Sequence, residues 1–415
     1  MSDKILWTKN PMQTKAPVAA LALAGRKEAE EARAFHRSFP QYTETPLVSL
    51  QHLADRLGVR GIYVKDESKR FGLNAFKVLG GSYAMGRYIA DRLGYDLADL
   101  PYWRLGSREI RDQLGEVTFF TATDGNHGRG VAWAANQLGQ KSVVYMPAGS
   151  SLYRLERIRD EGAEASIQDM NYDEAVRLVA QRAEQTPNGV MVQDTAWDGY
   201  EEIPGWIMQG YGTMALEADA QIRAAGDVPT HIFVQAGVGS LAGTIQAYFA
   251  DVYGERCPVT TVMEPHVANC HYESAVAGGY RTVGGEMQTI MAGLACGEPN
   301  TISWDILKNW TDCFVSCPDW VAARGMRMAA APLTGDEPIV SGESGAVGLG
   351  LLSAILQGGD IELDALRGEL GLDENSVVLL FSTEGDTDPQ TYTDIVWDGD
   401  YCSKEGCKCY GLSEN

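Results

Sequence analysis

Short apolar strands alternate with helix-forming stretches along most of this chain. One series lies in the middle of the chain, with expected strands at 117–121, 142–146, 164–167 and 190–193 and expected helices at 152–160 and 172–183. A second series has expected strands at 231–235, 259–264 and 377–381. Strands that alternate with helices form βαβ units, whose strands pair in parallel. The pattern therefore predicts an α/β protein, and 415 residues are enough for two domains with their own cores.

The chain is strongly acidic, with a formal net charge of −22. This balance argues against a nucleic-acid or anionic-membrane surface, because both require a basic patch. No run approaches the roughly 18 apolar residues of a membrane-spanning helix. The first residues show no hydrophobic signal region, and the eight cysteines lack the spacing of a secreted disulfide framework. We therefore expect a cytoplasmic protein with no nucleic-acid and no membrane partner.

One lysine stands in an unusual setting at a strand-to-helix junction. A strand is expected at 62–65, and Asn74 is the expected N-cap of a helix with one buried face, which places Lys77 in its first turn. Apolar neighbours surround Lys77, and Gly80-Gly81 admits a close approach to the backbone. Burial and the positive helix end lower a lysine pKa and give the neutral amine that attacks a carbonyl. The alternative is an ordinary solvated surface lysine.

The segment Lys-Asp-Glu-Ser-x-Arg-Phe-Gly-x-Asn-x-Phe-Lys at 65–77 resembles the lysine segment of the fold-type-II pyridoxal-phosphate enzymes. That family includes threonine and serine dehydratases, cysteine synthase and the tryptophan synthase β subunit, and the motifs here are most similar to those of the diaminopropionate ammonia-lyases. The resemblance extends from about 36 to 397. It implies two three-layer αβα domains with the active site between them: a discontinuous large domain (1–89 plus 201–415) and a small domain (90–200). It also implies that Lys77 carries pyridoxal 5'-phosphate and that the enzyme is a homodimer.

A glycine turn, Gly237-Val238-Gly239-Ser240, follows one expected strand and opens a helix. Backbone N–H groups in such a turn can hold the cofactor phosphate. The rival interpretation is a dinucleotide fingerprint, Gly237-x-Gly239-x-x-x-Gly243, which would indicate an NAD(P)-dependent oxidoreductase. Its position past the middle of the chain argues against that, since a dinucleotide-binding domain usually has this turn in its first βα unit.

The stretch Thr123-Asp124-Gly125-Asn126-His127-Gly128 resembles the family's S-x-G-N-H-G loop. The resemblance implies that Asn126 contacts the pyridoxal ring hydroxyl and that the loop backbone, with Thr123, Gly125 and His127, holds the substrate carboxylate. His127 either supports the loop or acts as an acid or base. Asp124 departs from the dehydratase pattern, which has a small uncharged residue there. A carboxylate at this place would act as a base, bind a substrate ammonium, or merely cap the helix.

Further candidates lie at the ends of two strands. Asp194 is a candidate for binding the substrate β-ammonium, because ligands of parallel sheets lie at the carboxyl ends of the strands. A loop-capping role for Asp194 is the alternative. In the family a hydroxyl or thiol near Ser382-Thr383 meets the pyridine nitrogen. The tail cysteines Cys402, Cys407 and Cys409 lack zinc-site spacing, so no metal is expected. The redox state of Cys270 and Cys296 stays open, and no function is assigned to the acidic stretch 95–116.

Together these motifs predict a pyridoxal-phosphate-dependent lyase that acts on a small-molecule amino acid. The resemblance implies α,β-elimination of 2,3-diaminopropionate to pyruvate and two ammonia. It further implies that Lys77 is the base for the L substrate and Asp124 for the D substrate. A serine/threonine dehydratase or a β-replacement enzyme is the nearest alternative. A non-catalytic ligand sensor is a more distant one.

Overall fold

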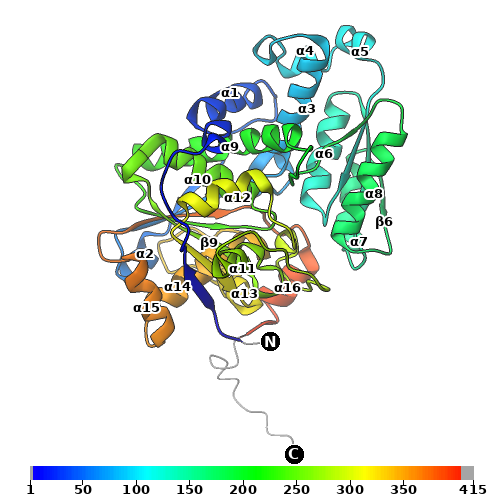
Figure 1. Ribbon diagram of the computed structural model, residues 1–415. Coiled ribbons are helices and arrows are strands. Elements are labelled where there is room, and N and C mark those ends of the chain that lie inside the picture. Colours follow the sequence, from blue (N-terminus) through cyan, green and yellow to red (C-terminus); the bar gives the residue numbers. More distant parts are fainter. Residues whose placement is uncertain (1–2, 403–415) are drawn as a thin grey trace, which may run out of the picture.

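The computed structural model describes residues 3–402, which form two β-sheets with helices on their faces (Figure 1). The 7-stranded sheet has the order β1 (Leu6–Lys9), β10 (Cys313–Cys317), β9 (Val259–Pro265), β8 (His231–Gln235), β11 (Val377–Ser382), β3 (Gly61–Asp66), β2 (Leu47–Ser49). The 4-stranded sheet has the order β6 (Glu164–Ile167), β5 (Lys141–Met146), β4 (Thr118–Ala122), β7 (Gly189–Met191). All pairs are parallel except the edge pairs β1–β10 and β2–β3. The predicted α/β class with mostly parallel sheets is confirmed.

Helices cover both faces of the larger sheet. One face packs on α1 (Arg26–His36), α3 (Val78–Leu93), α9 (Glu202–Ala224), α10 (Ser240–Tyr253) and α12 (Thr301–Trp310). The other face packs on α2 (Gln51–Leu57), α13 (Asp319–Ala330), α14 (Glu343–Gln357) and α15 (Ile361–Leu370). Along β11 the side chains alternate between these two cores, and all six residues of the strand are buried. This is the expected pattern for a strand covered on both faces.

The smaller sheet is covered in the same way. One core contains residues of α6 (Asn126–Gln137) and α7 (Leu152–Asp160), and the other contains residues of α8 (Tyr172–Gln185). The remaining α-helices of the described residues are α4 (Tyr102–Leu105), α5 (Arg108–Leu114), α11 (Cys270–Ala277) and α16 (Pro389–Val396). Helices α4 and α5 belong to the acidic stretch 95–116, whose Leu105 and Ile110 are buried in the same core as α3. All strands of the smaller sheet lie between 118 and 191; the domain boundaries themselves stay a prediction.

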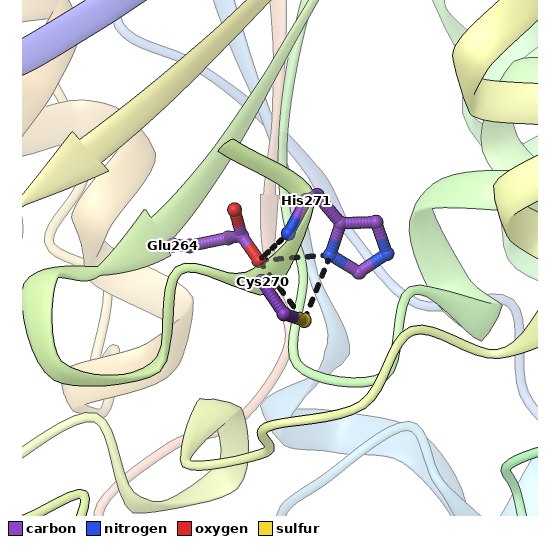
Figure 2. A group of neighbouring side chains, drawn as sticks. All are labelled: Glu264, Cys270 and His271. Atoms are coloured by element: carbon purple, nitrogen blue, oxygen red, sulfur yellow. Dashed lines mark hydrogen bonds and ion pairs between the residues drawn. The ribbon is translucent and has the colours of Figure 1, made fainter. Parts of the chain in front are cut away.

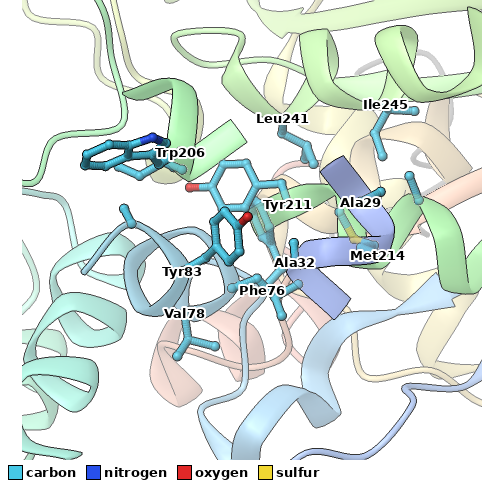
Figure 3. Close-up of a cluster of buried hydrophobic side chains, with 14 of the residues drawn as sticks. Ala29, Ala32, Phe76, Val78, Tyr83, Trp206, Tyr211, Met214, Leu241 and Ile245 are labelled. Atoms are coloured by element: carbon cyan, nitrogen blue, oxygen red, sulfur yellow. The ribbon is translucent and has the colours of Figure 1, made fainter. Parts of the chain in front are cut away.

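The helix α3 is packed tightly between α9 and α6. A Cβ at Gly80 would lie 2.6 Å from the side chains of Ile207 and Tyr211, and a Cβ at Gly210 would lie 2.5 Å from the Leu79 carbonyl oxygen. A Cβ at Gly130 of α6 would lie 2.8 Å from the Val78 nitrogen. Figure 3 shows the apolar side chains from α1, α3, α9 and α10 that pack together where α3 lies against α9. Gly80 therefore admits α9 and Gly130 admits the start of α3, whereas a Cβ at Gly81 would make only ordinary contact with Val131 of α6.

The expected N-cap at Asn74 is wrong. Helix α3 begins at Val78, and Asn74 lies in the left-handed region with φ 61°. The reason is that residues 74–76 pair with the loop after β11 instead of entering a helix. The Phe76 N–H donates to the Thr383 carbonyl at 3.1 Å, and the Gly385 N–H donates to the Asn74 carbonyl at 3.0 Å. Lys77 therefore precedes the helix instead of lying within its first turn.

Within residues 3–402, no single helix has the length and apolar character needed to cross a membrane. Taken together, α14 and α15 meet that criterion, but they are bent by 105° relative to one another.

Candidate active site

A cavity of about 920 Å³ lies at the carboxyl ends of strands from both sheets. The loops after β4, β8 and β11 line it, together with Lys77 and Asp194. Ligands of parallel α/β proteins bind at this end of the strands. Most of the predicted site residues line this cavity: Lys77, Thr123, Asp124, Asn126, His127, Asp194, Gly237, Val238, Gly239, Ser240 and Thr383. Gly125 and Ser382 do not.

The Lys77 amino group forms an ion pair with the Asp194 carboxylate. Burial by itself lowers the pKa of Lys77, but Asp194 and Tyr211 more than offset it, so the pKa is raised above its usual value. The expected lowering of the Lys77 pKa is therefore wrong for this arrangement, because sequence reasoning did not pair the lysine with a carboxylate 117 residues away. Burial raises the pKa of Asp194, but Lys77 and His127 reverse this and lower it to about 2.

A buried ion network fixes the segment that leads to Lys77. The Arg70 guanidinium lies 2.8 Å from Glu67 and 2.7 Å from Glu217 of α9, and Lys65 lies 2.8 Å from the same Glu217 carboxylate. The Lys65, Glu67, Arg70 and Glu217 side chains are fully buried. Buried charges need such mutual pairing. Lys65, Glu67 and Arg70 thus anchor the segment to α9 and do not line the cavity, whereas Lys77 at the end of the motif does.

The glycine turn connects β8 to α10 and lines the cavity throughout. Gly239 has φ 97°, a left-handed conformation that favours glycine. A Cβ there would also lie 2.5 Å from Nε2 of His271. Because the first N–H groups of a helix have no partner within that helix, the start of α10 offers donors and a positive dipole end to an anion.

A buried polar group lies behind this turn. Figure 2 shows Glu264 at the end of β9 with Cys270 and His271 at the start of α11. The Glu264 carboxylate accepts the backbone N–H and the Nδ1–H of His271 at 2.9 and 2.8 Å, and the Tyr272 N–H at 2.8 Å. These hydrogen bonds occupy the carboxylate and attach α11 to β9, which supports the turn from behind.

The loop between β4 and α6 is stabilised by its own side chains. Thr123 Oγ1 accepts the N–H groups of Gly125 and Gly128 at 2.9 and 3.1 Å. His127 Nε2 lies 2.9 Å from the Val192 carbonyl oxygen, and burial lowers the pKa of its imidazole. A neutral imidazole that donates to this carbonyl matches the loop-supporting alternative for His127. Asn126 donates to Glu384, and Asp124 Oδ2 lies 3.2 Å from Nη1 of Arg154.

The two hydroxyl candidates after β11 lie in different places. Thr383 lines the cavity and accepts from the Gln235 amide at 2.9 Å. Ser382 is buried behind it and donates to Ser341 at 2.8 Å. Of the two, only Thr383 is in a position to meet a ligand in the cavity.

Sequence reasoning missed several charged residues of the cavity, notably Arg154, Glu343 and Glu384. Burial and the neighbouring Glu384 carboxylate raise the pKa of Glu343 to about 7. Glu384 directly follows Ser382-Thr383 at the strand end, so its position was a usable signal. Arg154 lies one helical turn from Ile158 on the buried face of α7, and an arginine on an apolar face was the signal there.

The structure describes some, but not all, of the cysteines that the sequence analysis singled out. Neither Cys270 nor Cys296 forms a disulfide with another described residue, and Cys296 lines the cavity. Of the three tail cysteines, Cys407 and Cys409 lie outside the described residues.

Comparison with known proteins settles the family. The model of the family described as pyridoxal-phosphate dependent enzyme matches residues 39–379. This chain belongs to the pyridoxal-phosphate dependent enzyme family. Pyridoxal phosphate is therefore its cofactor, as predicted, and the glycine turn does not indicate a nicotinamide enzyme.

Individual members of this family are similar over most of their length. Diaminopropionate ammonia-lyase from Salmonella typhimurium is 55% identical over 385 residues, which cover 92% of this chain and 95% of the relative. The Escherichia coli enzyme of the same name is 50% identical over 378 residues, with 91% and 93% covered. A crystal structure of holo diaminopropionate ammonia lyase from Escherichia coli superposes with a TM-score of 0.90 at 47% identity and covers 97% of this chain and 99% of that one. The predicted fold-type-II family and lyase activity are confirmed.

The residues of the cavity fit the cofactor. Lys77 supplies an amine for its aldehyde, and the N-terminus of α10 supplies N–H donors for its phosphate. The left-handed Gly239 allows the turn to lie close against His271 and Ser303, where a Cβ would be 2.5 and 2.8 Å from their side chains. Asn126 and Thr383 supply polar groups from two further loops. These assignments of individual residues stay predictions.

Proposed function

We propose that this enzyme converts 2,3-diaminopropionate to pyruvate and two ammonia by α,β-elimination. The observation that carries the proposal is a pair of carboxylates, Asp124 and Asp194, that face the cavity around the amino group of Lys77. Asp194 already pairs with an ammonium, that of Lys77. A substrate with a second amino group, and not a hydroxyl, has a use for such a carboxylate.

Three side chains of the cavity then have separate roles in the reaction. When bound, pyridoxal phosphate withdraws electrons from the substrate Cα and makes its proton acidic. Lys77 accepts the Cα proton of the L isomer, and Asp124 accepts that of the D isomer. Asp194 holds the β-ammonium until it leaves as ammonia, and the released aminoacrylate reacts with water to give pyruvate and the second ammonia.

A substrate panel tests this proposal. We expect kcat/KM for 2,3-diaminopropionate to exceed the values for serine and threonine by at least about 100-fold, because serine and threonine leave a buried cavity carboxylate without its charged partner. Higher kcat/KM for serine or threonine would identify a dehydratase and contradict the proposal.

We also propose that the enzyme works as a homodimer in the cytoplasm. The eight cysteines lack the spacing of a secreted disulfide framework, which supports a reducing compartment. The family resemblance implies the dimer. Sedimentation velocity at micromolar concentration is expected to give a single species of twice the 45.1 kDa chain mass, and a monomer would contradict it.

A further inference from the structure

The cavity contains far more negative than positive side chains. Among the described residues that line it, Lys77 and Arg154 are the only lysine or arginine. The carboxylates number eight: Asp124, Asp173, Asp194, Glu286, Asp319, Glu343, Glu384 and Asp388. An amino-acid substrate must place its own carboxylate among these groups, and like charges in a buried site repel strongly. Lys77 pairs with Asp194 and is the lysine predicted to carry the cofactor, which leaves Arg154 as the cation for the substrate carboxylate.

Arg154 has the burial and the free hydrogen-bond donor of an anion-binding residue. Its side chain is 8% exposed and lines the cavity. Nη1 lies 3.2 Å from Asp124 Oδ2, Nη2 lies 3.9 Å from Glu343 Oε2, and Nε is buried with no hydrogen-bond partner among the described residues. A buried, unpartnered N–H of a charged group costs stability unless a ligand completes it. The planar guanidinium can bind a carboxylate through two parallel hydrogen bonds.

The N-terminus of α6, which is the positive end of the helix dipole, lies next to Arg154. The stem of Arg154 lies against the loop before α6: a Cβ on Gly125 would be 2.9 Å from Arg154 Cδ. Gly125 is also the residue that precedes the 12-residue helix α6. The positive dipole end of α6 and the guanidinium therefore act together on one side of the cavity.

We propose that Arg154 binds the α-carboxylate of the substrate, next to the N-terminus of α6. This assignment rests on the proposed function only in that the ligand is an α-amino acid. It also explains how Asp124 is tolerated in a loop that receives a carboxylate. The guanidinium already lies 3.2 Å from Asp124 Oδ2, so its charge offsets the repulsion that Asp124 would otherwise exert on the substrate carboxylate.

The alternative is that Arg154 only connects α7 to α14 through Glu343. A ligand pair separates the two roles. Alanine carries the α-carboxylate but no β leaving group, and isopropylamine is the same amine with a methyl group in place of the carboxylate. Binding of each to the holoenzyme is read from the change in the visible absorbance of the cofactor, which requires no turnover.

For Arg154→Gln we expect the dissociation constant of alanine to rise about 10- to 100-fold, as for the loss of a charge-assisted hydrogen bond. The dissociation constant of isopropylamine should stay within about twofold. Arg154→Lys should recover part of the alanine affinity, since it restores the charge without the fork. The control Arg157→Gln removes an arginine of the same helix that pairs with Asp160, and it should change neither constant.

An equal rise in the dissociation constants of both ligands, or no change in either constant, would overturn the proposal. If Arg154→Gln does not fold, the comparison of Arg154→Lys with the parent enzyme decides, because a mere connection to Glu343 predicts equal affinities for alanine. The outcome is independent of the substrate panel. Selective loss of alanine binding in an enzyme that prefers serine would refute the proposed function and leave the role of Arg154 intact.

Discussion

Lys77 lies at the meeting point of several chain segments, and each constrains its amino group. Its backbone is held by the pairing of 74–76 with the loop after β11, and its side chain lies over the Phe76 and Tyr211 rings. The pairing with Asp194 raises the pKa of Lys77 and favours its charged amine. Burial alone therefore does not give the neutral nucleophile in this arrangement.

The first residue-scale prediction concerns this lysine. Lys77→Ala should lose the visible absorbance band of the bound cofactor and reduce kcat by roughly 10⁴-fold or more. The reason is that Lys77 is predicted both to bind the cofactor and to accept the substrate Cα proton. Lys69→Ala, an exposed lysine of the same segment, should keep both. Borohydride reduction and peptide mapping locate the labelled lysine, and a label elsewhere would disprove the assignment.

Asp124 is the second residue-scale case. A base acts on one face of the substrate only, so Asp124→Asn should reduce kcat for D-diaminopropionate by about 10²–10⁴-fold, with a smaller loss for the L isomer. Asp173→Asn removes another carboxylate of the same cavity and controls for charge alone. Steady-state kinetics on both isomers check this. Equal losses on D and L would instead indicate a shared role such as binding the β-ammonium.

At the scale of elements, the β8–α10 turn is the part that should hold the phosphate. Gly239→Val adds a side chain whose Cβ would lie 2.5 Å from Nε2 of His271, so the turn must shift and cofactor affinity should fall about 10- to 100-fold. Gly226→Val is a matched control: its φ is 85° and nothing lies near its Cβ. Equilibrium titration with pyridoxal phosphate measures both. Equal affinity in the two variants would exclude the turn as the phosphate site.

Elements with local signals were predictable from the sequence. The helix at 152–160 and the strands at 164–167 and 231–235 were predicted with the bounds that the structure shows. The helix α9 was not predicted: it contains Pro204, Gly205, Gly210 and Gly212 and is buried on most sides, so it shows no amphipathic period. Tertiary packing against α3 and α1 stabilises it and overrides its weak helix propensity.

The residues of the candidate site were likewise predictable only where the local sequence marks them. Residues that follow strands, such as Asp124, Asp194 and Gly239, were predictable, because parallel strands end at one edge of the sheet. Pairings between distant segments were not. The contact of Asn126 with Glu384 and that of Lys77 with Asp194 join residues more than 100 positions apart, and only the folded chain brings them together.

At the scale of the whole molecule, the buried network of Lys65, Glu67, Arg70 and Glu217 joins the lysine segment to α9. Burial raises the pKa of Glu217, but Arg70 and Lys65 reverse this and lower it to about 2 from its usual 4.5. Such a carboxylate stabilises the fold above its unfolded pKa, and this contribution is lost as the pH falls through the folded value. The wild-type protein should therefore lose stability between about pH 4.5 and 2.

Glu217→Gln removes one carboxylate and leaves Arg70 and Lys65 underpaired in the core. We expect a loss of about 3–5 kcal/mol in unfolding free energy near neutral pH and a weaker dependence of stability on pH below about 4.5. Denaturant unfolding of the holoenzyme at several pH values measures both. Glu202→Gln, exposed at the start of the same helix, should behave like the wild type. An unchanged stability of Glu217→Gln would show that the network is dispensable.

The ratio of ammonia to pyruvate formed from 2,3-diaminopropionate tests the central claim most directly. Elimination of the β-amino group followed by hydrolysis of aminoacrylate releases two ammonia for each pyruvate. Because serine loses water first, the same enzyme should give one ammonia per pyruvate from serine. We predict a ratio of two with diaminopropionate over the full course of the reaction. A ratio of one, or pyruvate formation from serine alone, would contradict the assignment as a diaminopropionate ammonia-lyase.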